Sequence, residues 1–254
     1  LNYNTLAFMM SACYTVGRLS CTGCHESHHL RSVKGQGETR AASYEQICLD
    51  CHRLDVGQDL EQHSRHKTVG CIGCHMPVVD EVKRIGVYDH RIASPVPANT
   101  DGFGIPNACN RCHSDREVAW ATEWVRKWWG PQDERVAVTK TIALGRAGDA
   151  KALEGLMAIL SDLEQSTVLR ASVSVFLGRQ TDSRAQAALI EALKDGHPLV
   201  RSRAVEGLMG LGAGAEEMVR LLDDPSKLVR MRVAAALEGL EAEVPEVRRR
   251  LSAA

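Results

Sequence analysis

The chain has 254 residues, enough for two modest domains, and its formal net charge at pH 7 is −1. The part up to Gly130 contains 14 of the 31 Lys and Arg residues and 14 of the 32 Asp and Glu residues, and the part after it contains 17 and 18. Neither half is therefore a basic arm, and nucleic acid is not an expected partner. No stretch approaches the roughly 18 apolar residues that cross a bilayer, so no transmembrane segment is expected.

A five-residue motif, Cys-x-x-Cys-His, occurs four times in the first half of the chain. It is the attachment signature of c-type haem, in which each Cys forms a thioether with a haem vinyl group and the His binds the iron. Chance would give roughly 0.01 such motifs in a chain of this length. The pattern predicts four covalently attached haem c groups, bound at Cys21, Cys24 and His25, at Cys48, Cys51 and His52, at Cys71, Cys74 and His75, and at Cys109, Cys112 and His113.

Zinc is the alternative ligand for these cysteines. Paired Cys-x-x-Cys units can form a tetrahedral zinc site, but a His directly after every second Cys serves no zinc geometry, so haem is favoured. The ninth cysteine, Cys13, is expected to be a buried thiol, with intermolecular pairing as the alternative. Covalent haem attachment takes place outside the cytoplasmic membrane, so we expect an exported protein, periplasmic or extracellular, whose export signal preceded Leu1.

The first half, residues 1–130, is predicted to be a tetrahaem domain. Four haems share the 93 residues from Cys21 to His113, which show little sustained periodicity, and the proline-containing segment Ser94 to Asn107 is predicted to be a loop. So short a polypeptide cannot build a large core from side chains, and the haems are expected to fill the interior instead. We expect short helices at the motifs and long connecting loops.

Each iron has a second axial position, whose occupant decides between electron transfer and catalysis. His28 lies three residues after His25, so it can serve only a neighbouring haem. His63 and His66 are also three apart, and one helical face could supply two haems. Methionine ligation is not favoured, because Met76 directly follows His75. The predicted distal ligands are His28, His63, His66 and His90, with His29 as the alternative.

A helix is predicted from Asp115 to Trp129. Ser114 can cap it, and the tryptophans at positions 120, 124 and 128 form a stripe at four-residue intervals. The stripe is interpreted as packing, with electron hopping as a less favoured role. Gly130 and Pro131 end the helix.

Residues 131–254 are predicted to form a second domain of helical repeats. An apolar residue followed by Arg recurs at Leu169-Arg170, Val200-Arg201 and Val229-Arg230, and each copy follows a Leu-containing helix and an Asp-containing turn. The arginines are 31 and 29 residues apart. The pattern resembles short HEAT-like repeats, with tetratricopeptide repeats as the alternative. The predicted fold class is therefore all-α with extensive loops, a haem-packed tetrahaem module followed by a HEAT-like α-solenoid.

The motifs resemble a large bacterial family of multihaem c-type cytochromes that fuse a haem module to HEAT or tetratricopeptide repeats. The similar segments are Cys21 to His28, Cys71 to Pro77, Asp89 to Arg91 and Pro106 to His113. In that family the residue that corresponds to His28 is an axial ligand. The resemblance implies electron transfer, and further haem motifs upstream of this chain.

Three functional hypotheses follow. An electron conduit, which we favour, has both axial positions filled on all four irons and no catalytic residues. A multihaem oxidoreductase needs one haem with an open position, and the Cys-x-x-Cys-Lys variant of one such family is absent. In the third hypothesis the repeats carry the function and the haems are scaffold. The expected partner is another redox protein or copies of this chain, which could assemble into an extracellular filament.

Overall fold

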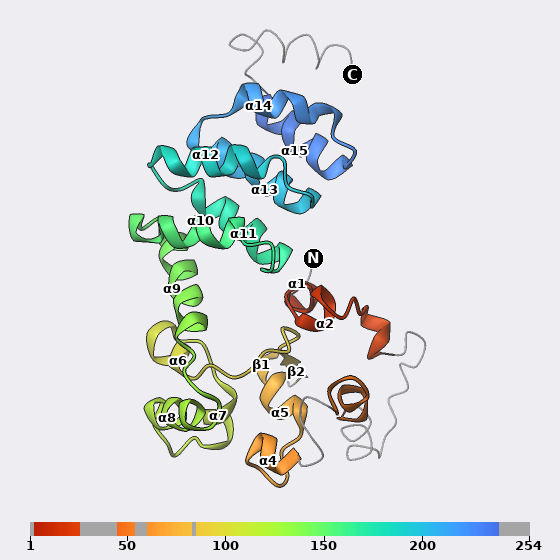
Figure 1. The fold of residues 1–254 in the computed structure, drawn as a ribbon, viewed down its shortest axis with the longest axis vertical. Helices are drawn as coiled ribbons and strands as arrows, with labels where there is room; N and C mark the ends of the chain where they lie inside the picture. The colour runs from red at the N-terminus through yellow and green to blue at the C-terminus, as the bar shows by residue number, and fades with distance from the viewer. Residues whose placement is uncertain (1–2, 26–44, 54–59, 83–84, 239–254) are drawn as a thin grey trace. The chain divides into compact units, whose positions relative to one another are not determined.

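A computed structural model of the chain describes residues 3–25, 45–53, 60–82 and 85–238 (Figure 1). The described residues are mostly helical, as the sequence predicts, and no helix among them is long and apolar enough to span a membrane. The chain divides into two compact units, which are Leu1–Gln132 and Asp133–Ala254. The cysteine motifs all lie in the first unit and the repeats in the second.

The first unit consists of short helices and one hairpin. Its described hydrophobic side chains bury little area between them: among the large apolar residues only Phe8, Val125 and Pro97 are buried, beside the alanines 7, 108 and 121. The elements in chain order are α1 (Tyr3–Met9), α2 (Ala12–Thr15), η1 (Cys21–Gly23), a helix over residues 45–53, α4 (Leu60–Ser64), α5 (Cys71–His75), β1 (Val78–Val82), β2 (Ile85–Tyr88), α6 (Ala98–Phe103), α7 (Ala108–Cys112) and α8 (Val118–Trp129).

The antiparallel pair of β1 and β2 is a feature that the sequence analysis missed. Val78 pairs with Tyr88 and Val82 with Ile85, with a bulge between Val78 and Asp80. Valine and isoleucine are frequent in both strands, and β-branched residues fit a pleated surface well. The backbone N–H of Asp89 donates to the carbonyl of Pro77 at 3.0 Å and closes the open end of the hairpin. The hairpin therefore brings the residues after Tyr88 back to the end of α5.

The second unit is a stack of helix pairs. Its elements are α9 (Asp133–Ala147), η2 (Ala150–Ala152), α10 (Leu153–Ser161), α11 (Thr167–Leu177), α12 (Ser183–Ala192), α13 (Pro198–Leu211), α14 (Ala215–Val219), η3 (Arg220–Asp223) and α15 (Lys227–Leu237). Helix α10 packs on α11, α12 on α13, and α14 with η3 on α15, while α11, α13 and α15 pack on one another in turn. Figure 1 shows these pairs as successive layers from green to blue.

A shared apolar stripe builds the core of this stack. Val200, Ala204 and Leu208 recur at four-residue intervals on α13 and are fully buried, and α15 repeats the pattern with Val229, Val233 and Leu237. Val200 and Val229, the apolar residues of the repeated apolar-Arg pairs, are therefore core residues. Leu169, at the corresponding position of α11, is partly buried and packs against the same core.

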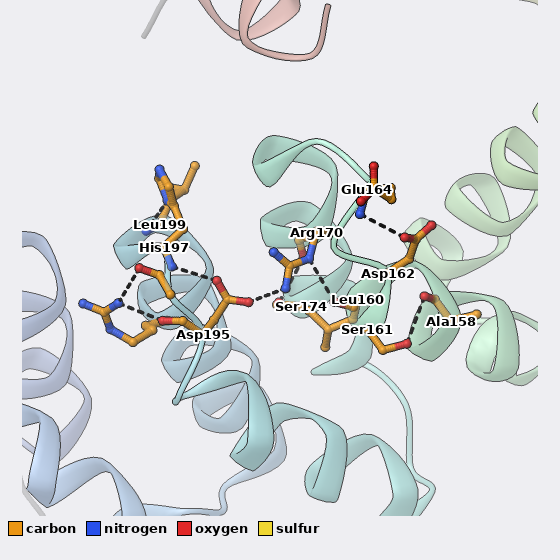
Figure 2. Close-up of polar contacts among 12 residues, drawn as sticks. Ala158, Leu160, Ser161, Asp162, Glu164, Arg170, Ser174, Asp195, His197 and Leu199 are labelled. Atoms are coloured by element: carbon orange, nitrogen blue, oxygen red, sulfur yellow. Dashed lines mark hydrogen bonds and ion pairs between the residues drawn. The ribbon is translucent and has the colours of Figure 1, made fainter. Parts of the chain in front are cut away.

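The repeated arginines join one helix pair to the next. Arg170 forms an ion pair with Asp195 in the turn before α13, and its Nε donates to the carbonyl of Leu160 at the end of α10 at 3.0 Å (Figure 2). Arg201 repeats the arrangement, since its Nε and Nη2 donate to the two carboxylate oxygens of Asp224 at 2.8 Å each. Arg201 also donates to the carbonyl of Asp195, so each of these two arginines bonds a carbonyl of its own helix pair and an acid of the following pair.

Candidate functional site

Each cysteine motif lies in a short helical segment. Motif three forms α5, motif four lies in α7, motif one begins at η1, and motif two lies in the helix over residues 45–53. In motifs one and four the backbone N–H of the His donates to the carbonyl of the first Cys at 2.9 Å. A single turn therefore places both thiols and the imidazole of a motif together. None of the nine cysteines, all of which lie within the described residues, is in a disulfide.

His90 faces the histidine of the first motif. The ring centroids of His25 and His90 are 6.2 Å apart and the ring planes are inclined by 36°. His90 lies two residues after the end of β2, and its Nδ1 lies 2.9 Å from the carbonyl oxygen of Tyr88. The next turn is held by Asp89, a buried carboxylate that accepts hydrogen bonds from the backbone N–H and the guanidinium of Arg91 at 2.6 to 3.1 Å.

His63 faces the histidine of the third motif. The centroids of His63 and His75 are 6.3 Å apart and their planes are inclined by 22°. His63 lies in the last turn of α4, and His75 is the last residue of α5. The two short helices therefore present one histidine each to the same space.

His66 faces the histidine of the fourth motif, with 6.1 Å between the centroids of His66 and His113 and 49° between the planes. The expectation that His63 and His66 share one helical face is wrong. Helix α4 ends at Ser64, and Arg65 has a φ of 60°, in the left-handed region. The hydroxyl of Ser64 donates to the carbonyl of His66 at 2.9 Å and holds this turn, so the two histidines point to different partners.

The remaining histidines are those of the second motif and the two that follow the first. His52 is exposed on the helix over residues 45–53. His28, the predicted distal ligand, and His29, its alternative, lie outside the described residues.

Glu45 is a residue of the site that the sequence analysis missed. Its carboxylate accepts hydrogen bonds from the backbone N–H of Cys71 at 3.0 and 3.1 Å and from the thiol of Cys71 at 3.1 Å. It thereby joins the helix of the second motif to the start of α5. Gly70 directly precedes α5, and only glycine fits there, because a Cβ on Gly70 would lie 2.4 Å from the Oε2 of Glu45. Burial, followed by this carboxylate, raises the pKa of Cys71 to about 12.

Burial also raises the pKa of several other motif thiols, because it disfavours the charged thiolate. The pKa values of Cys24, Cys48, Cys74 and Cys109 all shift in this direction, and nearby thiols of other motifs add to the shift, except that a hydrogen bond with the Cys71 thiol lowers the pKa of Cys48. For Cys74 the neighbour is Cys112, and for Cys24 it is Cys51. The thiols of motifs one and two therefore lie near one another, and α5 of motif three packs against α7 of motif four. Burial raises the pKa of Cys13 too, which lies close to Cys24.

Two segments near the motifs differ from what the sequence predicts. The helix expected from Asp115 begins at Val118, because the side-chain amide of Asn110 donates to the carbonyl of Arg116 at 2.8 Å and holds residues 114–117 in a turn. The segment Ser94 to Asn107, expected to be loop throughout, contains α6 (Ala98–Phe103). Gly104, at a φ of 67°, ends α6.

Residues 60–154 match the family of cytochrome c552. The match supports a c-type cytochrome. It covers the third and fourth motifs together with His63, His66 and His90. Comparison with curated proteins gives no match for this chain. A c-type cytochrome carries covalently bound haem c and transfers electrons, and such proteins are typically exported.

Proposed function

We propose that this c-type cytochrome is a tetrahaem electron conduit, a chain of four haems whose irons each have two histidine ligands. The observation that carries the proposal is the spacing of three histidine pairs, at 6.2, 6.3 and 6.1 Å between ring centroids. Each pair joins the histidine of a Cys-x-x-Cys-His motif to a histidine outside the motifs.

This spacing fits an iron between the rings. An imidazole nitrogen binds a transition metal at about 2.0–2.1 Å and the ring centre lies roughly 1.1 Å behind it, so two rings on opposite sides of one ion have centroids about 6.2–6.4 Å apart. The three pairs are thus spaced as axial ligands of one metal ion would be.

The hydrogen bonds of the distal histidines support the same assignment. The Nδ1 atoms of His90 and His66 lie 2.9 and 2.6 Å from the carbonyl oxygens of Tyr88 and Ser64. A backbone carbonyl accepts only from a protonated nitrogen, so Nδ1 carries the proton and Nε2 keeps the lone pair that binds metal. Both rings are therefore held in the tautomer that a ligand requires.

The fourth haem follows by elimination. Its thioethers would come from Cys48 and Cys51, its proximal ligand would be His52, and its distal ligand would be His28, with His29 as the alternative. The full ligand set that we propose comprises the thioether residues Cys21, Cys24, Cys48, Cys51, Cys71, Cys74, Cys109 and Cys112, the proximal histidines 25, 52, 75 and 113, and the distal histidines 28, 63, 66 and 90.

When bound, haem c supplies a one-electron Fe(III)/Fe(II) couple. The chain's residues fix each haem by two thioethers, occupy both axial positions and leave no position for a substrate to bind iron. Imidazole on both sides favours comparatively low reduction potentials, since methionine is the ligand that raises them. Motif two is joined to motif three through Glu45, the thiols of motifs one and two lie near each other, and α5 packs against α7, so the four irons would form a continuous series.

We further propose that residues 131–254 are a HEAT-like repeat domain that docks residues 1–130, the tetrahaem domain, against another redox protein or copies of the same chain. Stacked helix pairs of this kind present long continuous faces. The expected location is the periplasm or the cell exterior. A head-to-tail contact that does not close would give a filament.

Two measurements on the oxidised full-length protein test the conduit. The mass of the denatured chain should exceed that of the peptide by four haems, and low-temperature EPR should show low-spin ferric haem only. Fewer haems, or bound zinc, would contradict the assignment. A high-spin haem in the parent protein would instead favour a multihaem oxidoreductase with one open position.

A further inference from the structure

Every tryptophan of this chain lies on one helix and beside one pair of histidines. The four tryptophans are Trp120, Trp124, Trp128 and Trp129, all within α8. The ring of Trp120 lies 4.9 Å from that of His113, inclined by 54°. The ring of Trp128 lies 6.4 Å from that of His66, in an edge-to-face contact at 89°. The remaining indoles contact these two.

The stripe connects the two contacts without a break. Trp120 and Trp124 are 6.4 Å apart, and Trp124 and Trp128 are 5.0 Å apart. Together with His66 and His113 they form a closed circuit of five aromatic rings, in which the two imidazoles face each other at 6.1 Å. The indoles therefore flank the space between the imidazoles on the side of α8.

Helix α8 is held firmly with respect to the fourth motif. Ala121 and Val125 of α8 are buried, and the helix packs against α6 and α7. Asn110, inside the motif, donates to the carbonyls of His113 at 3.3 Å and Arg116 at 2.8 Å and so fixes the turn between motif and helix. The ammonium of Lys127 lies 4.4 Å from the ring centre of Trp124 and packs on the stripe. The indoles are thus fixed surfaces against which the imidazoles rest.

A metal ligand that is fixed only through its bond to iron can rotate about that bond. The hydrogen bond at its second nitrogen, which for His66 goes to the carbonyl of Ser64, and the side chains packed against its ring together select one orientation. The three histidine pairs differ in this respect: the planes of His66 and His113 are inclined by 49°, against 22° for His63 and His75 and 36° for His25 and His90. The pair with the largest inclination is the one with an indole against each ring.

We propose that Trp120 and Trp128 are positioning residues that set the orientation of the two imidazole planes at the His66–His113 pair. They thereby fix the ligand field of the iron bound there, and distinguish this haem from those of the other two histidine pairs. The proposal rests on the conduit function, because it requires His66 and His113 to be ligands of one iron. Its physical basis is that the g anisotropy of low-spin ferric haem depends on the angle between the planes of its axial imidazoles.

The test is low-temperature EPR of the oxidised full-length protein and of its Trp120→Ala and Trp128→Ala variants. One low-spin signal of the four should change its g values in both variants. The others should stay as in the parent, and every haem should stay low-spin. Trp120→Phe and Trp128→Phe keep an aromatic contact and should leave the signal closer to its parent position, which separates orientation from loss of folding. Trp129→Ala is the matched control, because Trp129 is 46% exposed and its ring contact is with Trp128, not with either histidine.

The changed signal must also be the one that His66→Ala converts to high spin. Unchanged g values in both Trp→Ala variants, a change at a signal that His66→Ala leaves intact, or a change spread equally over all signals would overturn the proposal. Failure of the conduit function itself is visible separately in the parent, as a haem count below four or a high-spin signal.

Discussion

His63 and His75 lie with their imidazole rings inclined by only 22° and their centroids 6.3 Å apart, although α4 and α5 are separate helices. The left-handed Arg65 begins the turn that brings the chain back, so that the second helix ends opposite the first. A short stretch of chain thus supplies a histidine on each side of one space. Its dimensions are those of a metal ion with two imidazole ligands.

We predict that His63→Ala opens one axial position. The reduced variant should bind carbon monoxide at one haem in four, and the oxidised variant should show one high-spin signal, because no second imidazole remains opposite His75. Absorption and EPR spectra of the full-length protein measure both effects. His197→Ala is the control, since this histidine caps α13 through its Nδ1 and lies outside the haem motifs. Carbon monoxide binding by the parent to the same extent would contradict the prediction.

We predict that Cys71 is the slowest of the motif thiols to be alkylated before haem is attached. Its pKa of about 12 lies three units above the ordinary value of 9.0, so at about pH 8 its thiolate fraction is roughly a thousandfold smaller than that of an ordinary thiol. Glu45→Gln removes the charge but keeps the burial, so the variant should be alkylated faster, though still more slowly than an ordinary thiol. Mass spectrometry of iodoacetamide-treated apoprotein gives the rate at each cysteine. Equal rates at Cys71 and at the exposed Cys21 would contradict this prediction.

The sequence predicts the parts of this molecule that depend on local covalent chemistry or on periodicity. The spacing of Cys and His within each motif predicts a covalently bound haem, and the recurring Val200 and Val229 are enough to place the buried face of the repeats. The parts that it does not predict depend on hydrogen bonds made by one side chain to the backbone of another segment. The late start of α8 depends on the amide of Asn110, and the link between two motifs depends on Glu45, which is an ordinary surface acid in the sequence.

The distal histidines are predicted by the sequence only in part. The number of extra histidines predicts that most are ligands, but their partners follow from the path of the chain. His90 reaches the first motif because the hairpin of β1 and β2 turns the chain back, and this hairpin is set by strand pairing across the turn. His63 and His66 separate because Arg65 adopts a left-handed conformation, which is uncommon for a residue other than glycine.

We predict that Asp224→Asn weakens the repeat unit and flattens its dependence on acid. The bidentate Arg201 guanidinium holds the pKa of Asp224 below its ordinary value of 3.8, and the side chain is buried. A depressed carboxyl pKa contributes stability that is present above the unfolded value and lost as the pH falls through the folded value. Removing the charge should therefore lower the free energy of unfolding by about 3 kcal/mol at pH 7, with less further loss below pH 3.8 than in the parent.

Thermal unfolding followed by far-UV circular dichroism, between neutral pH and acid, measures this effect in the full-length protein. Asp182→Asn is the matched control, because Asp182 also pairs with an arginine, Arg184, but both side chains are largely exposed. An exposed pair is screened by water, so the control should unfold almost as the parent does. Equal destabilisation by the two substitutions would show that the buried position of Asp224 has no special effect.

The final prediction concerns the close contact between α11 and α13. Gly178 follows α11 and Gly207 lies within α13, and a Cβ on Gly207 would approach the carbonyl oxygen of Ser174 to 2.5 Å. Because that atom belongs to a helix backbone, it cannot move aside as a flexible side chain would, and the helices must separate. Gly207→Ala should therefore lower the free energy of unfolding by about 1–3 kcal/mol, although alanine is the better helix former. Gly196→Ala is the control, since a Cβ there meets open space, and it should leave stability nearly unchanged. Urea unfolding followed by far-UV circular dichroism compares the two variants, and a Gly207→Ala protein as stable as the parent would show that the helices tolerate a wider separation than their packing indicates.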